Sequence, residues 1–420
     1  GTQTGFGRTG TVDWQTGSIK TTTFTAANGE GYFANTSGGA FTMNLPAGVA
    51  GAIVSVADYG DNFGTNPLTI SANGSDKIGG ETANAVLNVN GESVTLVFVD
   101  STEGWITVNA SSENIVGSEF LIASGGTETE DGNFKIHTFT GPGTFTVSQV
   151  SCTAADNTVS YLVVGGGGGG GMGQTNSGGG GGAGGFREYR APVSGCYAAS
   201  PLNGNPCGTA ITVTATSFPI TVGSGGAGHA LPTPGCQGAS GGVSTFSTVT
   251  SAGGGGGGSQ GSPTCGAGAN GGSGGGSAFN GSGSSGGTGN TPPVTPPQGQ
   301  PGGNNTTPGG AQASTGGGGA GAAATPVPQS PGPTPARGSA GGAGVSTSIT
   351  GASVARAGGG GSNMSDDTGN PGGTGGGGPG GSNGTDNTGG GGGGGSKNPA
   401  NASGSGNGGS GVVIIRYKFQ

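Results

Sequence analysis

The chain has 420 residues, of which 111 are glycine, and only 29% of its residues are hydrophobic. This composition excludes a conventional apolar core over most of the chain, although the apolar residues near the N-terminus suffice for an ordinary packed domain. Charged residues make up 7% and the formal net charge is -8, which excludes the basic surface that nucleic acids and anionic membranes require in a partner.

The N-terminal third predicts a domain made of short strands. The first residue is Gly1 rather than Met, which predicts that an upstream piece has been removed or is not included. Apolar and small polar residues alternate in segments such as 31–37, 51–59 and 93–100, and Gly, Asn, Asp and Pro separate them. This pattern is typical of a half-buried antiparallel sheet and predicts a β-sandwich-like or barrel-like domain over residues 1–112. The alternation then lapses, which indicates a connector over residues 113–133.

Residues 134–420 predict a second domain, in which strands lead into glycine runs. "FKIHTFTGPGTFTV" (134–147) predicts a hairpin whose two strands are joined by Gly-Pro-Gly. The strand at 160–164 runs directly into seven glycines. Threonine- and serine-rich strands lead into polyglycine again within 243–258 and 345–361, and "VVIIRY" closes the chain after a fourth long run. We interpret this as a degenerate internal repeat and expect an all-β chain.

Two interpretations of the glycine runs remain open. A flexible linker is the usual reading of such a composition. Alternatively, the runs form polyproline II helices with about three residues per turn, which pack with their backbones touching and bond through outward N–H and C=O groups. Seven residues would then span about 22 Å. We favour ordered packing because strands precede the runs and an apolar strand ends the chain.

The segment 290–337 is rich in proline, since 11 of the 24 prolines fall between Pro292 and Pro335. Proline disfavours helices and central strands, so we expect exposed loops there. These loops serve either recognition or a passive spacer role.

The sequence contains no pattern of catalytic residues. His137 and His229 have no Ser, Cys or acid at a spacing that suggests a relay, and no glycine run continues into a phosphate-binding motif. We therefore expect no enzyme activity and no cofactor. The acidic segments 58–64 and 127–132 hold either calcium or solvated turns, of which we favour the turns.

The five cysteines form no C-x-x-C pair, so they predict no metal site. A disulfide between Cys196 and Cys207 would close a turn-rich loop, and Cys236 with Cys265 is a second possible pair, which leaves Cys152 over. Inert thiols are the alternative.

Aromatic residues suggest one surface contact. Tyr189 and Tyr197 lie near Arg187 and Arg190, so these side chains either stack against a sugar or protein or pack in a core between strands, which we favour.

The motifs "TFTGPGTFTV", "YLVVGGGGGGG", "STVTSAGGGGGG" and "GGSGVVIIRY", in this order, resemble the glycine-rich domain of tailed-bacteriophage fibre and virion proteins. The resemblance covers residues 134–420, and residues 12–109 look like a small β-domain of the same phage proteins. It implies a non-enzymatic, extracellular virion component, commonly a homotrimer, attached to other virion proteins through its N-terminal side.

A related arrangement in tail-fibre tip adhesins implies that loops contact a bacterial receptor, either a glycan or a protein. By this analogy the contact surfaces are the loops at 196–207, 229–240, 262–270 and 290–337. The candidate receptor-contact residues in these loops are Tyr197, Asn203, Asn205, His229 and Gln237. A purely structural capsid- or tail-attached fibre, an extracellular glycine-rich matrix protein and an ice-binding protein remain as alternatives.

Overall fold

The structure is a computed structural model, and it shows an all-β chain with one short 3₁₀ helix among the described residues. It describes residues 12–110, 120–151, 153–173, 178–204, 210–230, 237–260, 265–278, 284–305, 313–327, 338–363, 369–397 and 402–419. The chain divides into two compact units, of which the first comprises Gly1–Phe120 with Ser151–Ala154, and the second Leu121–Val150 with Ala155–Gln420.

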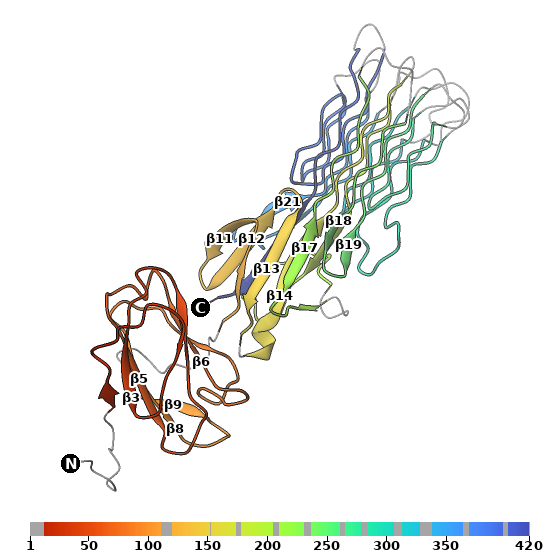
Figure 1. The fold of residues 1–420 in the computed structure, drawn as a ribbon. Coiled ribbons are helices and arrows are strands. Elements are labelled where there is room, and N and C mark those ends of the chain that lie inside the picture. Colours follow the sequence, from red (N-terminus) through yellow and green to blue (C-terminus); the bar gives the residue numbers. More distant parts are fainter. Residues whose placement is uncertain are drawn as a thin grey trace, which may run out of the picture. The chain divides into compact units, whose positions relative to one another are not determined.

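The first unit is a sandwich of two open sheets (Figure 1). One sheet has the order β1 (Asp13–Trp14), β3 (Glu30–Ala34), β5 (Ile53–Asp58), β8 (Ser93–Phe98) and β9 (Trp105–Ala110). The other has the order β2 (Phe24–Thr25), β4 (Phe41–Asn44), β6 (Leu68–Ser71) and β7 (Ala85–Leu87). The sandwich expected from the alternating pattern is confirmed.

The strand pairing within this sandwich differs from the expected antiparallel arrangement. β3 pairs with β5, and β4 with β6, in parallel. From β1 to β6 the chain alternates between the two sheets. Each strand therefore lies beside the strand two elements earlier in the chain and runs parallel to it. The expectation of antiparallel pairing is therefore wrong for β3–β5 and β4–β6 and correct for β5–β8, β8–β9 and β6–β7.

An apolar core fills the space between these two sheets. β8 alternates between half-buried and buried side chains along its whole length, as a strand with one face on a core must. The ring of Trp105 is fully buried and meets Phe98 edge to face, with ring centroids 5.6 Å apart. Such aromatic pairs add roughly 1 kcal/mol beyond their burial.

The second unit holds two larger sheets and one hairpin. One sheet has the order β11 (Thr127–Asp131), β12 (Phe134–Phe139), β22 (Val412–Lys418), β14 (Thr158–Val164) and β15 (Phe186–Tyr189), and β16 (Ile211–Thr212) also pairs with β14. The other has the order β10 (Ile122–Ser124), β13 (Gly143–Gln149), β17 (Ser217–Thr221), β18 (Ser244–Phe246) and β19 (Val249–Ser251). The hairpin consists of β20 (Val345–Thr347) and β21 (Val354–Arg356), and the 3₁₀ helix η1 covers Ala154–Asn157.

The C-terminal strand β22 lies at the centre of its sheet, between β12 and β14. Its side chains alternate between two apolar clusters. Val413 and Ile415 pack in the cluster that includes the second sheet, whereas Val412 and Ile414 pack with the β20 side of the unit. Burial on both faces explains why "VVIIRY" is an unbroken apolar run.

The hairpin predicted from 134–147 is wrong. Its two halves are β12 and β13, which belong to different sheets. The intervening residues 140–142 form a corner at which the chain passes from one sheet to the other. The connector predicted at 113–133 likewise contains β10 and β11, which pair with β13 and β12 of the second unit.

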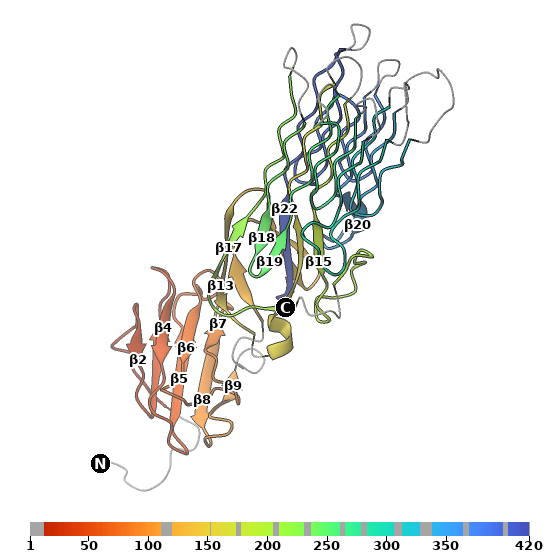
Figure 2. The same cartoon turned by 90° about the vertical axis from the view of Figure 1, so that its right-hand side faces the viewer.

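Beyond the strands, the glycine runs lie side by side as extended segments (Figure 2). We call these segments glycine rods; among the longest are residues 165–171, 178–185, 253–258, 358–363, 389–395 and 403–411. They hydrogen-bond to one another rather than within themselves. The ordered packing expected for these runs is therefore present, and the linker interpretation fails for the described glycines.

The rod 165–171 shows how this lattice is built. The N–H groups of Gly165, Gly168 and Gly171 donate to rod 178–185, those of Gly166 and Gly169 to residues 242 and 239, and those of Gly167 and Gly170 to residues 409 and 406. A repeat of three is the period of a polyproline II helix. Each rod can thus bond neighbours on several sides, which satisfies its backbone polar groups.

Close packing is the reason for the glycines. A Cβ atom on Gly166, Gly167 or Gly168 would overlap the carbonyl oxygen of Ser224, Gly390 or Gly255, respectively, each on a different neighbouring rod. No face of this rod therefore has room for a side chain, and Cα–H groups approach the carbonyl oxygens instead. At the lattice surface the rule relaxes, because Ser224 and Ala227 are exposed.

Side-chain oxygens cap several N–H groups at the lattice surface. Asn270 Oδ1 accepts from Thr288 N at 2.8 Å, and Asn304 Oδ1 from Gly286 N at 2.8 Å. Asn407 Oδ1 accepts from Gly228 N at 2.8 Å. Asn and Asp side chains thus provide the acceptor that an absent neighbouring rod would have supplied.

The proline-rich region 290–337 forms rods as well as loops. Residues 299–303 and 315–320 bond to neighbouring rods through their main chains. Gln298 is buried, and its side chain accepts from Ala252 N at 2.9 Å and donates to Pro292 O at 2.8 Å. The segment around Gln298 therefore packs on the strand side of the lattice. Residues 306–312 and 328–337 lie outside the described residues.

Candidate functional site

The glycine rods run side by side from the strands to the opposite end of the lattice, which we call the loop end (Figure 2). Main-chain bridges there pair Met172 with Gly395 and Gly178 with both Ser259 and Asn363. The bridges Ser396–Ser403, Ser284–Asn305 and Asn305–Val327 belong to the same end. These described residues flank several of the segments that connect one rod to the next.

Buried polar side chains terminate the rods at the loop end. Ser259 Oγ donates to Met172 O at 2.6 Å, and Ser314 Oγ donates to Asn363 O at 3.0 Å. Asn363 Nδ2 in turn donates to Ser403 Oγ at 2.6 Å. These bonds replace the rod-to-rod bonds where the lattice stops, and they hold the starts of the connecting segments in place.

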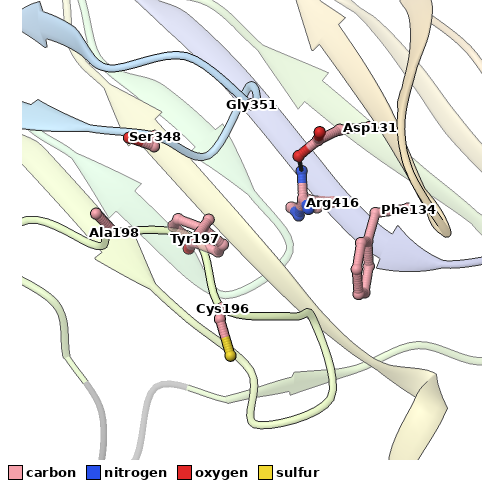
Figure 3. Close-up of a pocket in the computed structure, with 8 residues that line it drawn as sticks. All are labelled: Asp131, Phe134, Cys196, Tyr197, Ala198, Ser348, Gly351 and Arg416. Carbon is pink, nitrogen blue, oxygen red and sulfur yellow. Dashed lines mark hydrogen bonds and ion pairs between the residues drawn. The ribbon is translucent and has the colours of Figure 1, made fainter.

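A separate pocket opens near the strands of the second unit (Figure 3). Its volume is about 440 Å³, and it is lined by Asp131, Phe134, Cys196, Tyr197, Ala198, Ser348, Gly351 and Arg416. These residues come from the ends of β11 and β12, from the loop after β15, from the turn after β20 and from β22. The pocket therefore depends on the packing of segments that are distant in sequence.

Arg416 is 3% exposed and forms the base of the pocket. Its Nη1 donates to Asp131 Oδ2 at 2.8 Å and to Ile349 O at 3.3 Å, and its Nε donates to Ser194 O at 3.2 Å. The guanidinium carbon lies 4.4 Å from the ring centroid of Phe134 and 5.5 Å from that of Tyr197. Stacking and hydrogen bonds together hold this planar cation in a single orientation.

The lattice and its strands coincide with a known sequence family. The model of a family described as a glycine-rich domain matches residues 138–418. The chain belongs to this glycine-rich domain family. A comparison with curated proteins finds no match.

The candidate receptor-contact residues of this glycine-rich domain do not form one group. His229 and Gln237 lie at the loop end, where His229 Nε2 bonds Gln237 O at 3.0 Å and His229 N donates to Ser405 Oγ at 2.8 Å. Tyr197 and Asn203 instead lie beside β15, near the strands. Asn205 is outside the described residues. The described residues 196–204 therefore do not share the loop end with the described residues 229–230 and 237–240.

Tyr197 and Asn203 make structural contacts in the glycine-rich domain. Tyr197 is 6% exposed and packs in an apolar cluster with Leu162 and Ile414. Burial raises the pKa of its hydroxyl strongly. Asn203 Oδ1 accepts from Arg190 N at 2.9 Å, and its main chain bridges to Glu188. Tyr189 is also 6% exposed. Both tyrosines therefore pack in the core, as we favoured from the sequence.

The disulfide predictions stay predictions. Cys196 is exposed and lines the pocket, but Cys207, Cys236 and Cys152 lie outside the described residues. Cys265 is half-buried at the loop end.

His137 is fully buried between the two sheets of the domain. Because a carbonyl oxygen only accepts, its Nδ1 donates to Gly125 O at 2.7 Å, and its Nε2 lies 3.1 Å from the hydroxyl of Tyr417. Burial lowers the pKa of the imidazole below its ordinary value of 6.5, although Gly125 and Glu128 oppose the shift. This environment describes a core histidine with satisfied ring nitrogens.

The acidic segments have clear structural roles. Residues 127–131 are the exposed edge strand β11, whereas Asp58 in the turn 58–64 accepts from the N–H groups of Gly60, Phe63 and Gly91. No group of three or more His, Cys, Asp or Glu side chains suited to a metal ion occurs among the described residues. The described part of the chain also has no helix with the length and apolar character to cross a membrane.

Proposed function

We propose that this chain is a non-enzymatic fibre component of a tailed-phage virion that contacts the host cell surface through the segments between its glycine rods. The observation that carries the proposal is that many rods end side by side at the loop end. The described residues that flank the segments 174–177, 231–236, 261–264, 328–337 and 398–401 lie next to this end, and these segments differ in length and sequence.

The construction of the lattice supports a display role. The rods are held by main-chain hydrogen bonds to one another, and these bonds do not involve the side chains of the connecting segments. The connecting sequences can therefore change without altering the block that holds them. Recognition residues are commonly found on such loops above a rigid scaffold, because a stiff support lowers the entropy lost on binding.

The resemblance of the motifs in residues 134–420 to those of phage fibre and virion proteins supplies the biological setting of the proposal. They also support a homotrimer that attaches to other virion proteins through the N-terminal side and binds a glycan or protein receptor. A symmetric homo-oligomer is the usual way to build such an appendage. Light scattering of the purified chain measures the oligomeric state, and a monomeric mass would contradict this part of the proposal.

Competition for adsorption tests host contact. Purified protein is added to host cells, and adsorption of the phage that encodes it is measured over a range of protein doses. We expect dose-dependent inhibition by the wild type and a loss of inhibition when residues 328–337 and 231–236 are replaced by Gly-Ser segments of equal length. Val294 and Thr295 belong to the proline-rich loop 290–337 but lie on the strand side of the lattice, so their replacement is the matched control and should leave inhibition unchanged.

Two results would argue for a purely architectural fibre instead. The first is an absence of inhibition by folded wild-type protein at saturating dose. The second is equal inhibition by the wild type and the loop replacements. Incorporation of the chain into virions, measured by mass spectrometry of purified particles, tests the virion assignment separately from the receptor contact.

A further inference from the structure

We propose that the pocket around Arg416 is a binding site for a neutral saccharide, in which adjacent ring hydroxyls bond to the Arg416–Asp131 pair. This site goes beyond the proposed host contact, because it lies beside the strands and not at the loop end. Its residues come from four separate stretches of the chain, and the loop analogy covers only one of these stretches, residues 196–198.

The guanidinium of Arg416 is held rigidly while one edge remains available. Nε and Nη1 are bonded to Ser194 O, Asp131 and Ile349 O, and two aromatic rings cover the faces of the group. Among the described residues, Nη2 has no hydrogen-bond partner, and the pocket lies against Arg416. A donor that is already fixed in place loses little entropy when it binds a ligand.

Two acceptors complement this donor. Asp131 uses Oδ2 for Arg416, and within the described part of the chain its Oδ1 and the Oγ of Ser348 have no protein partner. A donor and an acceptor side by side match two neighbouring hydroxyls, each of which can both donate and accept. The pair therefore presents the pattern that a vicinal diol needs.

The charges around the pocket favour a neutral ligand over an anion. Arg416 is paired with Asp131. Asp131 lies against the same guanidinium, so its negative charge would repel a carboxylate or phosphate bound at Nη2. A hydroxyl group carries no such penalty.

The size and walls of the pocket suit a single sugar ring. A volume of about 440 Å³ falls in the range of small-molecule sites. Phe134, Tyr197 and Ala198 provide apolar wall beside the polar groups, and Figure 3 shows Phe134 and Tyr197 on either side of Arg416. Sugar rings carry both C–H faces and hydroxyl edges, and this arrangement contacts both.

Ligand-observed NMR and titration calorimetry test the proposal on the full chain. The probes are the methyl α- and β-glycosides of glucose, galactose and mannose, with glucuronate and inorganic phosphate as anionic probes. Oligosaccharides released from the host envelope form a second arm, which separates a free sugar from the end of a surface polysaccharide. We expect at least one neutral glycoside to bind and neither anion to compete with it.

Conservative variants locate the site. Asp131→Asn and Ser348→Ala should each weaken binding, by about tenfold for Asp131, because a hydrogen bond to a charged group is lost. The matched controls are Glu130→Gln on the same strand and Ser346→Ala on the same hairpin, both exposed and outside the pocket. The controls should bind like the wild type. Ser348→Ala removes a half-exposed hydroxyl, so it keeps the test valid if Asp131→Asn destabilises the domain.

Three results would overturn the saccharide site. These are no binding of any neutral glycoside or envelope oligosaccharide, preferential binding of glucuronate or phosphate, and equal binding by the wild type and both pocket variants. Each is independent of host contact, since adsorption competition by the wild type can persist in all three cases. Conversely, a failed competition assay leaves direct sugar binding to the pocket measurable.

Discussion

Substitution of Gly168 by alanine tests the physical basis of the glycine lattice. Gly168 lies in the middle of rod 165–171, where its N–H donates to Gly182 O at 2.8 Å and its C=O accepts from Gly392 N at 2.9 Å. A Cβ atom at this position would overlap the carbonyl oxygen of Gly255 on rod 253–258. The backbone fixes the positions of both the new Cβ atom and the Gly255 carbonyl oxygen, so neither can rotate away and the two rods must separate.

The cost follows from the bonds that join these two rods. Gly254 N donates to Gly166 O at 2.8 Å, and Gly257 N donates to Gly169 O at 2.9 Å. A buried hydrogen bond that is broken and left unsatisfied costs about 1–3 kcal/mol. Alanine offsets roughly 0.5–1 kcal/mol of this loss of stability, because it lowers the conformational entropy of the unfolded chain relative to glycine. We expect the free energy of unfolding of the second unit to fall by about 1–5 kcal/mol.

Urea unfolding with two readouts measures this change. Hydrogen exchange of peptides from the second unit, followed by mass spectrometry, reports on the lattice. Both tryptophans, Trp14 and Trp105, lie in the first unit, so their fluorescence is an internal control. Gly141→Ala is the matched variant, because a Cβ there meets no atom within 4 Å. Equal urea midpoints for Gly168→Ala, Gly141→Ala and the wild type would refute the close-packing argument.

Three further predictions concern the second unit. The amide protons of Gly166–Gly170 should exchange as slowly as those of β14, and exchange near the rate of an unstructured peptide would show that the rods are not bonded. Because burial holds the pKa of His137 below 6.5, the unfolded state binds its proton first as the pH falls; the unit should lose stability below about pH 6.5. His137→Gln should flatten that part of the pH profile, and an identical profile for both proteins would contradict the assignment. Asn407→Ala should speed exchange of the Gly228 amide and lower the free energy of unfolding by about 1 kcal/mol, because it removes the acceptor at 2.8 Å. Ala227→Ser, at an exposed position beside Gly228, should change neither the exchange rate nor the stability.

The residue pattern predicted the all-β class and the strands that lead into glycine runs, and it favoured the ordered packing of those runs over a flexible linker. These features follow from local physics. Alternating burial marks strands such as β8, and glycine in every position of 165–171 is needed only where backbones touch on all sides. The apolar run of β22 likewise predicted an ordered strand at 412–417, and the structure shows that both of its faces are buried.

The tertiary structure alone decided which segments meet. The chain from β1 to β6 alternates between two sheets, and residues 140–142 turn a corner rather than a hairpin, because long-range packing outweighs the preference of neighbouring strands to pair. It also placed Tyr197 near the strands and His229 at the loop end, and brought Asp131, Ser348 and Arg416 to one pocket. Such contacts depend on the folded path of the chain, and residues more than 200 positions apart carry no local signal of their proximity.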